Sequence, residues 1–194
     1  MKDTLEKIKQ EVSVCQKCAL AQSRTKTVPG SGAPRAQIMF VGEGPGKNED
    51  EQGEPFVGAA GRILSELLAG IGLGREDVFI TNVVKCRPPL NRDPLPEEVA
   101  ACHDYLERQV ALIRPRIIVL LGRHAMDRFL PGLKISRDHG QPKRLDGQVY
   151  YPIYHPAATI YHQALRQDLE KDFKKLPKII ALLEQEEKAV AGEA

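Results

Sequence analysis

The stretch IMFVGEGPGKNEDEQGEPFVG, Ile38 to Gly58, decides the fold class of this chain. An apolar run ends in glycines and charged residues, which is typical of a buried strand that leads into a ligand-binding loop. Two phosphate loops come close, and both fail on spacing. The P-loop requires glycine at Val41 and a hydroxyl residue at Asn48, and the dinucleotide fingerprint requires a third glycine at Lys47. The stretch therefore predicts a ligand-binding loop but does not identify the ligand.

The rest of the chain continues the alternation of strands and helices. DVFITNVV and PRIIVLLG are further β-branched runs, and helical patterns lie between the runs at about 58–72 and 96–113. Pro96 and the acidic residues after it are typical of a helix N-terminus. This βαβ rhythm predicts an α/β fold with a mainly parallel sheet and right-handed crossovers. Ligands then bind beyond the carboxyl ends of the strands, where the glycine loop, the end of ITNVV and HPAAT fall.

The carboxyl-terminal part predicts a hairpin and a helix. KRLDGQVYYPIYHP carries an Asp-Gly turn, and its second strand is expected to end at His155. A helix at about 162–187 follows, and the tail at about 185–194 is expected to fray. We see no internal repeat and no long linker, so one domain over residues 1–194 is expected.

Composition sets limits on location and partners. The 28 Lys and Arg residues nearly balance the 26 Asp and Glu residues, so any basic surface must be local. The amino terminus lacks the apolar core of a signal peptide, and no stretch is apolar and long enough to span a bilayer. We therefore expect a cytoplasmic protein without a membrane partner, in which four cysteines rarely form structural disulfides.

The four cysteines form a second motif. Cys15 and Cys18 make a C-x-x-C after the first helix, whereas Cys86 and Cys102 lie far along the chain and are separated by 15 residues. Four thiolates suit either a tetrahedral zinc site or an iron-sulfur cluster. Considered alone, Cys102 on a helix is expected to be a small buried apolar residue. One pair at chelating spacing with no cysteine left over favours a metal site, and the split second pair favours the cluster over zinc.

At this point the motifs resemble a known family. GEGPGKNEDEQGEPFVG, TNVVKCRPPLNR, the four-cysteine pattern and HPAAT are together similar to the family 4 uracil-DNA glycosylases, over about residues 10 to 160. Those proteins are iron-sulfur members of the uracil-DNA glycosylase superfamily and remove uracil from DNA. The resemblance implies a three-layer α/β/α sandwich around a four-stranded, mainly parallel sheet. It also implies a 4Fe-4S cluster, held by Cys15, Cys18, Cys86 and Cys102, and action as a monomer on uracil-containing DNA, single or double stranded.

The same resemblance assigns the uracil-binding residues. Cleavage of the bond between deoxyribose and uracil requires a flipped base, so the loop must approach the base closely. Gly42, Gly44 and Gly46 allow backbone donors near the base and phosphate. The ring of Phe56 is expected to stack on uracil. The Asn82 amide offers a donor and an acceptor side by side, which matches O4 and N3-H of uracil.

Two residues are expected to be catalytic. The resemblance implies that His155 donates a hydrogen bond to uracil O2 and stabilises the departing anion. Another branch of the superfamily has aspartate at the position of Gly44, so we expect Glu43 to position the water or to stabilise the cationic sugar. Glu49 is expected near uracil C5, where it would hinder a thymine methyl group. Three neighbouring carboxylates are expected to be solvated loop charges: Asp50, Glu51 and Glu54.

DNA contacts are expected around this centre. The basic side chains expected to contact phosphates are Arg87, Arg92, Lys143 and Arg144. Ile160 or Tyr161 is expected to enter the minor groove and fill the space that the flipped base leaves. We therefore predict a monofunctional uracil-DNA glycosylase. The alternatives are a noncatalytic DNA-damage or nucleotide-binding module with a structural metal, and a redox iron-sulfur protein.

Overall fold

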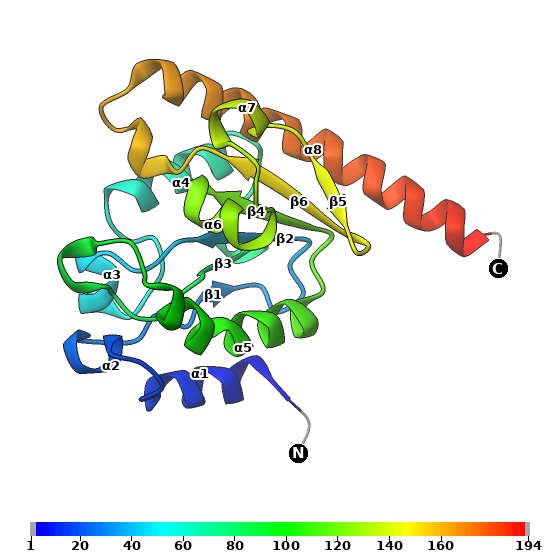
Figure 1. The fold of residues 1–194 in the computed structure, drawn as a ribbon. Helices are drawn as coiled ribbons and strands as arrows, with labels where there is room; N and C mark the ends of the chain where they lie inside the picture. Colours follow the sequence, from blue (N-terminus) through cyan, green and yellow to red (C-terminus); the bar gives the residue numbers. More distant parts are fainter. Residues whose placement is uncertain (1–2, 193–194) are drawn as a thin grey trace.

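The structure is a computed structural model that describes residues 3–192, and it is built on one six-stranded sheet (Figure 1). The strand order is β1-β3-β2-β4-β6-β5. The strands are β1 (Ser31–Gly32), β2 (Ile38–Gly42), β3 (Phe79–Asn82), β4 (Ile117–Leu121), β5 (Lys143–Leu145) and β6 (Gln148–Ile153). The neighbours β3, β2, β4 and β6 pair in parallel, as the βαβ rhythm predicts.

The sheet has two strands more than the four that were expected. Both are short antiparallel edge strands: β1 pairs with β3, and β5 pairs with β6 in the predicted hairpin. The hairpin turns at Asp146 and Gly147, which both have positive φ (49° and 81°), as the tight Asp-Gly turn requires. A strand as short as β1 leaves no periodicity to detect. The second hairpin strand ends at Ile153 instead of His155, because His155 caps a short helix, η3 (Pro156–Thr159).

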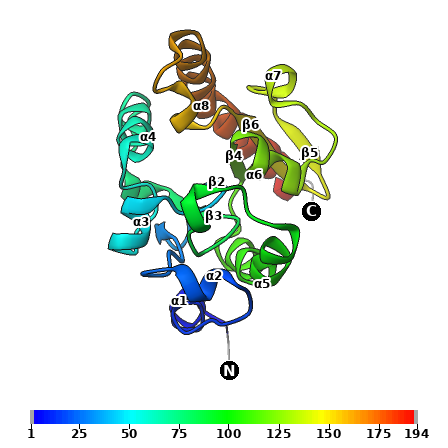
Figure 2. The same ribbon diagram turned by 60° about the vertical axis from the view of Figure 1, so that its left-hand side comes forward.

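Helices cover both faces of the sheet, which makes the predicted α/β/α sandwich (Figure 2). On β2, Met39 and Val41 pack on one helical layer and Ile38 and Phe40 on the other. The first layer contains α1 (Leu5–Ser13), α5 (Pro96–Ile113) and α6 (Gly122–Phe129), and the second contains α4 (Ala59–Ala69) and α8 (Gln163–Gly192). Two buried faces explain why the strands are continuous apolar runs.

The connections place a crevice at the carboxyl end of β2. Helix α4 leads from β2 to β3 over one face of the sheet, and α5 leads from β3 across to β4 over the other. The neighbours β2 and β4 are followed by helices on opposite faces, α4 and α6, so the strand order reverses between these two strands. Loops that leave the strands on either side of such a reversal diverge, and ligands of open α/β sheets bind in the space between them.

The long helices agree with the prediction, and the tail does not. The patterns at 58–72 and 96–113 are confirmed as α4 and α5. Helix α8 continues to Gly192, so the expected fraying is wrong up to that residue, and residues 193 and 194 lie outside the described range. The stretch is rich in Glu, Gln, Lys and Ala, which are strong helix formers. Besides α6 and η3, the short helices that the sequence did not predict are α2 (Leu20–Ser23), α3 (Lys47–Gln52), α7 (Ile135–Asp138), η1 (Arg75–Asp77) and η2 (Pro89–Asn91). Within the described residues, every helix is too short or too polar to span a bilayer.

Candidate active site

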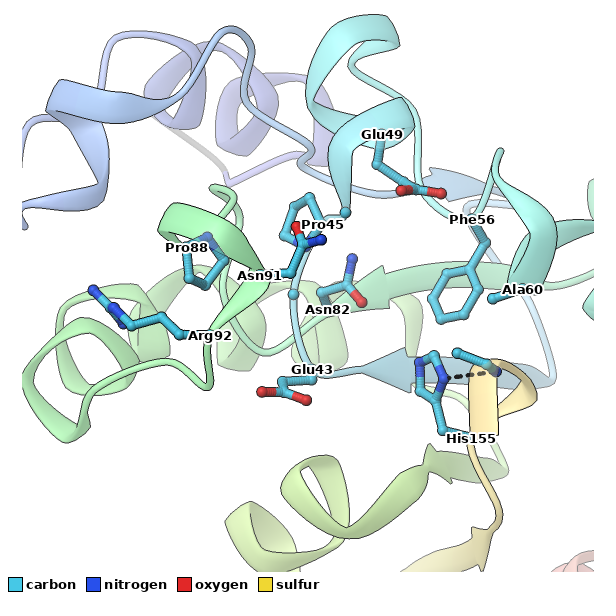
Figure 3. A pocket seen from close by; sticks show the side chains of 13 residues that line it. Glu43, Pro45, Glu49, Phe56, Ala60, Asn82, Pro88, Asn91, Arg92 and His155 are labelled. Carbon is cyan, nitrogen blue, oxygen red and sulfur yellow. Dashed lines mark hydrogen bonds between the residues drawn. The ribbon is translucent and has the colours of Figure 1, made fainter. Parts of the chain in front are cut away.

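A cavity of about 310 Å³ opens at the carboxyl ends of the parallel strands. It lies where the glycine loop, the end of β3 and the HPAAT segment meet (Figure 3). The residues that line it are Glu43, Gly44, Pro45, Gly46, Glu49, Phe56, Ala60, Asn82, Pro88, Asn91, Arg92, His155 and Ala157. The structure thus brings together both predicted catalytic residues and most of the predicted uracil-binding residues.

Gly42 allows two side chains of the site to approach the backbone closely. It is the last residue of β2 and pairs with Asn82 on β3. A Cβ atom at Gly42 would lie 2.4 Å from Asn82 Oδ1 and 2.8 Å from the ring of Phe56. Any side chain there would displace both groups. Although Gly42 does not line the cavity, it lets two of the cavity's side chains lie against the strand.

Glu49 holds the loop that carries Phe56. Its Oε1 accepts hydrogen bonds from the backbone N–H groups of Val57 and Gly58, both at 2.9 Å. Phe56 itself has a φ of 53°, which is unusual for a residue with a side chain. Arg75 donates to the carbonyl oxygens of Phe56 at 3.0 Å and Pro55 at 2.5 Å. These contacts hold the strained backbone and keep the Phe56 ring at the cavity.

Asn82 presents a buried oxygen that lacks a hydrogen-bond partner. The residue is 1% exposed, and within the described part of the chain Oδ1 has no donor. Beneath it, Lys85 Nζ donates to the backbone carbonyl of Asn82 at 2.8 Å, to Thr81 Oγ1 at 2.6 Å and to Gln109 Oε1 at 2.7 Å. Burial lowers the pKa of Lys85 to about 7. An unpaired buried acceptor costs free energy, so this amide is suited to a ligand donor.

His155 is neutral and has a defined tautomer. The backbone N–H of Ala157 donates to Nδ1 at 3.1 Å, so the single proton of the neutral ring is on Nε2. Burial lowers the pKa of His155 to about 4, and the nearby Glu49 carboxylate opposes this shift. The ring lies 5.6 Å from the ring of Phe56, centroid to centroid. His155 therefore offers the cavity one N–H donor at neutral pH.

Glu43 lies in a carboxylate-imidazole cluster at the edge of the cavity. Its Oε2 is 3.7 Å from His124 Nε2, and this nitrogen is 3.2 Å from Asp93 Oδ1. Burial raises the pKa of Glu43, and the His124 imidazole opposes the shift. Sequence reasoning missed His124, although it lies just after β4, at the edge where ligands bind. It also missed Arg75 and Asp93.

Comparison with known proteins identifies the family. A profile described as the uracil DNA glycosylase superfamily matches residues 29–182. The type-4 uracil-DNA glycosylase of Sulfurisphaera tokodaii is 51% identical over 186 residues, which are 90% of this chain and 84% of that protein. The chain belongs to the type-4 uracil-DNA glycosylases. Other members are those of Archaeoglobus fulgidus, with 51% identity over 90% of this chain and 92% of that protein, and Thermotoga maritima, with 43% identity over 92% and 95%.

The four cysteines of this type-4 chain meet in the helical layer of α1 and α5. Cys15 and Cys18 follow α1, Cys86 follows β3 and Cys102 lies on α5, and all four are free thiols in one core cluster. Arg24 Nη1 donates to Cys86 Sγ at 3.3 Å. Burial raises the pKa of Cys86 to about 11. Anionic thiolates at this depth therefore require a compensating cation, as metal ligands have.

The four thiols supply the donor set that either a tetrahedral zinc site or an iron-sulfur cluster uses.

The predicted DNA contacts divide into two groups. Arg87 and Arg92 are near the cavity, where Arg87 Nε donates to Asn91 Oδ1 at 2.7 Å and Arg92 binds the carboxylate of Glu98 at 2.8 and 2.6 Å. Arg92 thus also anchors its loop. Ile160 and Tyr161 follow η3 and are 40% and 89% exposed.

Lys143 and Arg144 do not lie with the cavity. They pair with Tyr150 and Val149, in the amino-terminal half of β6, because the tight turn joins the two hairpin strands at that end. Arg144 also donates to Glu186 on α8 at 2.5 Å. The hairpin therefore places both residues toward the end of the strands opposite the cavity, and their role as phosphate contacts stays a prediction.

Asp50 is not a solvated loop charge, contrary to the sequence prediction. It is 3% exposed, and its Oδ1 accepts a hydrogen bond from the backbone N–H of Thr25 at 2.9 Å. The unpredicted helix α3 turns this side chain inward, whereas Glu51 and Glu54 are exposed as predicted. Asp50 joins the glycine loop to the segment after α2.

Proposed function

We propose that this protein is a monofunctional uracil-DNA glycosylase. It hydrolyses the bond between deoxyribose C1′ and N1 of a uracil that is flipped out of DNA, and it leaves an abasic site, in the first step of base excision repair. The observation that carries the proposal is the unpaired buried oxygen of Asn82, in a cavity that also contains the neutral donor His155. Membership of the type-4 family supports the same activity.

In this proposal Asn82 reads the pairing edge of the base. Oδ1 accepts from uracil N3-H, which satisfies the orphaned acceptor, and Nδ2 donates to O4. Cytosine has an acceptor at N3 and an amine at C4, so both contacts fail. Phe56 forms the wall on which the uracil ring stacks, since its ring lines the cavity beside Gly42.

His155 stabilises the leaving group. Bond cleavage leaves the electron pair on uracil N1, and the negative charge is shared with O2. The Nε2 proton of His155 is available for a hydrogen bond to O2, since Nδ1 is occupied by the Ala157 N–H. A preorganised donor of this kind contributes about 2.7–4 kcal/mol to transition-state stabilisation. The low pKa keeps the ring neutral, so it donates a hydrogen bond without itself being an acid.

Glu43 acts at the sugar. As the bond to uracil breaks, positive charge develops on the deoxyribose ring, and a carboxylate at the cavity stabilises it and orients the water that attacks C1′. The attacking water loses its proton to Glu43 or to solvent. The side chain of Glu43 is 28% exposed, which leaves it in contact with water, and His124 faces its carboxylate. The ionised carboxylate of Glu43 is required, so the activity should decrease at pH values below the raised pKa of Glu43.

Glu49 closes the cavity near the expected position of uracil C5. Its carboxylate is held by the N–H groups of Val57 and Gly58, so it does not move aside easily. A thymine methyl group would therefore meet a fixed side chain. Gly44 also lines the cavity, where its backbone approaches the base or phosphate without steric conflict.

We infer that Cys15, Cys18, Cys86 and Cys102 hold a 4Fe-4S cluster. The support is the donor chemistry of the four cysteines, which lie in or against one core cluster, with one pair at chelating spacing and no cysteine left over. When bound, the cluster is a structural cross-link between the loop after α1, the loop after β3 and helix α5. None of the proposed catalytic steps passes through it.

DNA binding is proposed to use the surface around the cavity. Arg87 and Arg92 contact phosphates, and Ile160 or Tyr161 enters the minor groove. We expect the protein to act as a monomer on single- or double-stranded uracil-containing DNA. We expect a cytoplasmic location, where four cysteines rarely form structural disulfides.

The test is excision from an end-labelled oligonucleotide that contains one uracil. Treatment with alkali after incubation should break the strand at uracil and leave matched strands with cytosine or thymine intact. Breakage without alkali would show lyase activity and contradict the monofunctional assignment. Binding of the uracil strand without any scission would support the alternative, a noncatalytic DNA-damage module. His155→Ala serves as the catalytic control.

A further inference from the structure

The loop after β3 presents a leucine that contacts almost nothing. Leu90, in η2, is 95% exposed, more than any other large apolar residue in the described part of the chain. Its backbone is left-handed, with φ 55° and ψ 21°, and the next residue, Asn91, has φ 56°. This conformation is unfavourable for residues other than glycine. An exposed side chain on a strained backbone does not stabilise the fold, so it indicates a function.

The strained turn is held firmly. Two backbone hydrogen bonds close it: Asn91 N to Pro88 O at 3.0 Å and Arg92 N to Pro89 O at 3.2 Å. Arg87 Nε donates to Asn91 Oδ1 at 2.7 Å, which fixes the side chain next to Leu90. The two prolines fix φ ahead of the turn. The backbone that carries Leu90 is therefore preorganised, so that only the rotamer freedom of the side chain itself is lost when it enters an apolar site.

The arms of the turn are anchored in the same way. Arg92 binds both carboxylate oxygens of Glu98, which is 1% exposed, and Glu98 also accepts from the backbone N–H of Leu95 at 2.8 Å. On the other side, the buried Lys85 holds the end of β3. Movement of the Leu90 backbone would require these contacts to break.

Leu90 lies at the rim of the cavity. Its neighbours Pro88, Asn91 and Arg92 all line the cavity (Figure 3). His155 and Ala157, which precede the exposed Ile160 and Tyr161, line it from another element. The entrance for a flipped nucleotide thus has exposed apolar side chains on two separate segments.

We propose that Leu90 inserts into the base stack of double-stranded DNA next to the flipped uracil and holds the duplex open at the cavity. This inference rests on the proposed uracil-DNA glycosylase function. Flipping a base exposes the apolar faces of its neighbours, and a leucine on a firmly held turn covers them. A single strand has no opposite strand to keep apart. Leu90 is therefore a positioning residue for duplex substrates, while Asn82 and His155 act on both kinds of strand.

The experiment compares single-turnover excision from one uracil oligonucleotide, alone and in a duplex. Full burial of a leucine side chain corresponds to roughly 10- to 100-fold in affinity, so Leu90→Ala should lower the duplex rate at subsaturating enzyme by about this factor. Its rate on the single strand should stay within about twofold of the parent. Leu182→Ala is the matched control: it removes another exposed leucine, 49% exposed on α8, and should change neither rate.

A second variant separates function from folding. Glycine adopts the left-handed conformation freely, so Leu90→Gly should have an unchanged or higher midpoint of thermal unfolding while its duplex rate falls as in Leu90→Ala. A 2-aminopurine placed next to uracil in the duplex should brighten with the parent and stay dim with either Leu90 variant. This fluorescence reports unstacking independently of bond cleavage.

Three outcomes would overturn the inference. The first is a parental duplex rate in Leu90→Ala. The second is an equal loss on single and double strands together with a lower unfolding midpoint, which would indicate a structural role. The third is an absence of uracil excision by the parent on both substrates, which would refute the proposed function and the role of Leu90 with it. If the unmutated protein excises uracil from the single strand, the third outcome is ruled out, and only the first two outcomes can then overturn the role of Leu90.

Discussion

Replacement of His155 by alanine tests the proposed mechanism most directly. The change removes the one ring N–H that faces the cavity, and it leaves the Ala157 N–H without its acceptor. Loss of a preorganised donor to a developing anion costs about 2.7–4 kcal/mol, so we expect the single-turnover rate on uracil-DNA to fall by roughly 100- to 1,000-fold. Binding to uracil-DNA should weaken much less, because the contact forms fully only in the transition state.

The same variant tests whether the ring is neutral. The pKa of His155 is about 4 in the folded protein against 6.5 for an unperturbed histidine, because burial disfavours the charged ring. Between these pH values the unfolded chain binds a proton that the folded chain does not, so the free energy of unfolding falls as pH decreases from about 6.5 to 4. Linkage gives a loss of about 2 kcal/mol at pH 5, approaching about 3 kcal/mol at lower pH. His155→Ala lacks this contribution.

Urea unfolding of the parent and of His155→Ala at pH 7.5 and pH 5 measures the effect. Other titrating groups are common to both proteins, so the difference in unfolding free energy between them should shift by about 2 kcal/mol in favour of the variant at pH 5. His162→Ala is the matched control, because it removes an exposed histidine outside the cavity. A stability difference that does not change with pH would refute the neutral buried state, and a parental single-turnover rate would remove His155 from the mechanism.

The remaining predictions concern the base, the water and the metal. Asn82→Ala should lose uracil excision without gaining cytosine excision, and Asn82→Asp should depress uracil excision and allow trace cytosine release from matched oligonucleotides; near-parental uracil activity in both would make Asn82 a turn residue only. Because burial raises the pKa of Glu43, the acidic limb of the parental pH-rate profile should lie above the usual range for glutamate, and Glu43→Gln should slow the reaction and abolish that limb. An unchanged profile at an unchanged rate would exclude Glu43. The purified protein should be brown, with absorption near about 400 nm and about four irons per chain, whereas colourless protein with one zinc would contradict the cluster. Cys86→Ser should lose iron and stability together, and retention of both would show that Cys86 is not a ligand.

The strands and long helices were predictable because their signals are local. The runs IMFVG and PRIIVLLG are apolar throughout because both faces of β2 and β4 are covered by helices, and Pro96 marks the start of α5. Short elements such as β1 and α3 carry too few residues for a period to be visible. Asp50 was misplaced for this reason, since only the turn of α3 directs it inward.

The candidate site was partly predictable. The motifs that hold Gly42, Asn82 and His155 end parallel strands or follow them, and such ends meet at one edge of the sheet. Lys143 and Arg144 are basic and close to His155 in sequence, yet the hairpin places them toward the opposite end of the strands. Distance along the chain was a poor guide there, because an antiparallel partner runs back along the sheet.

The sequence by itself determined which segments form the buried strands, which motifs sit at their ends and which four sulfurs are available. Only the tertiary structure decided that His124 faces Glu43, that the Asn82 oxygen lacks a partner, that the His155 proton is on Nε2 and that Leu90 projects from the cavity rim. Hydrophobic periodicity depends on near neighbours in the chain. Protonation, burial and unpaired atoms depend on groups that strand order and helix packing bring together from distant parts of it.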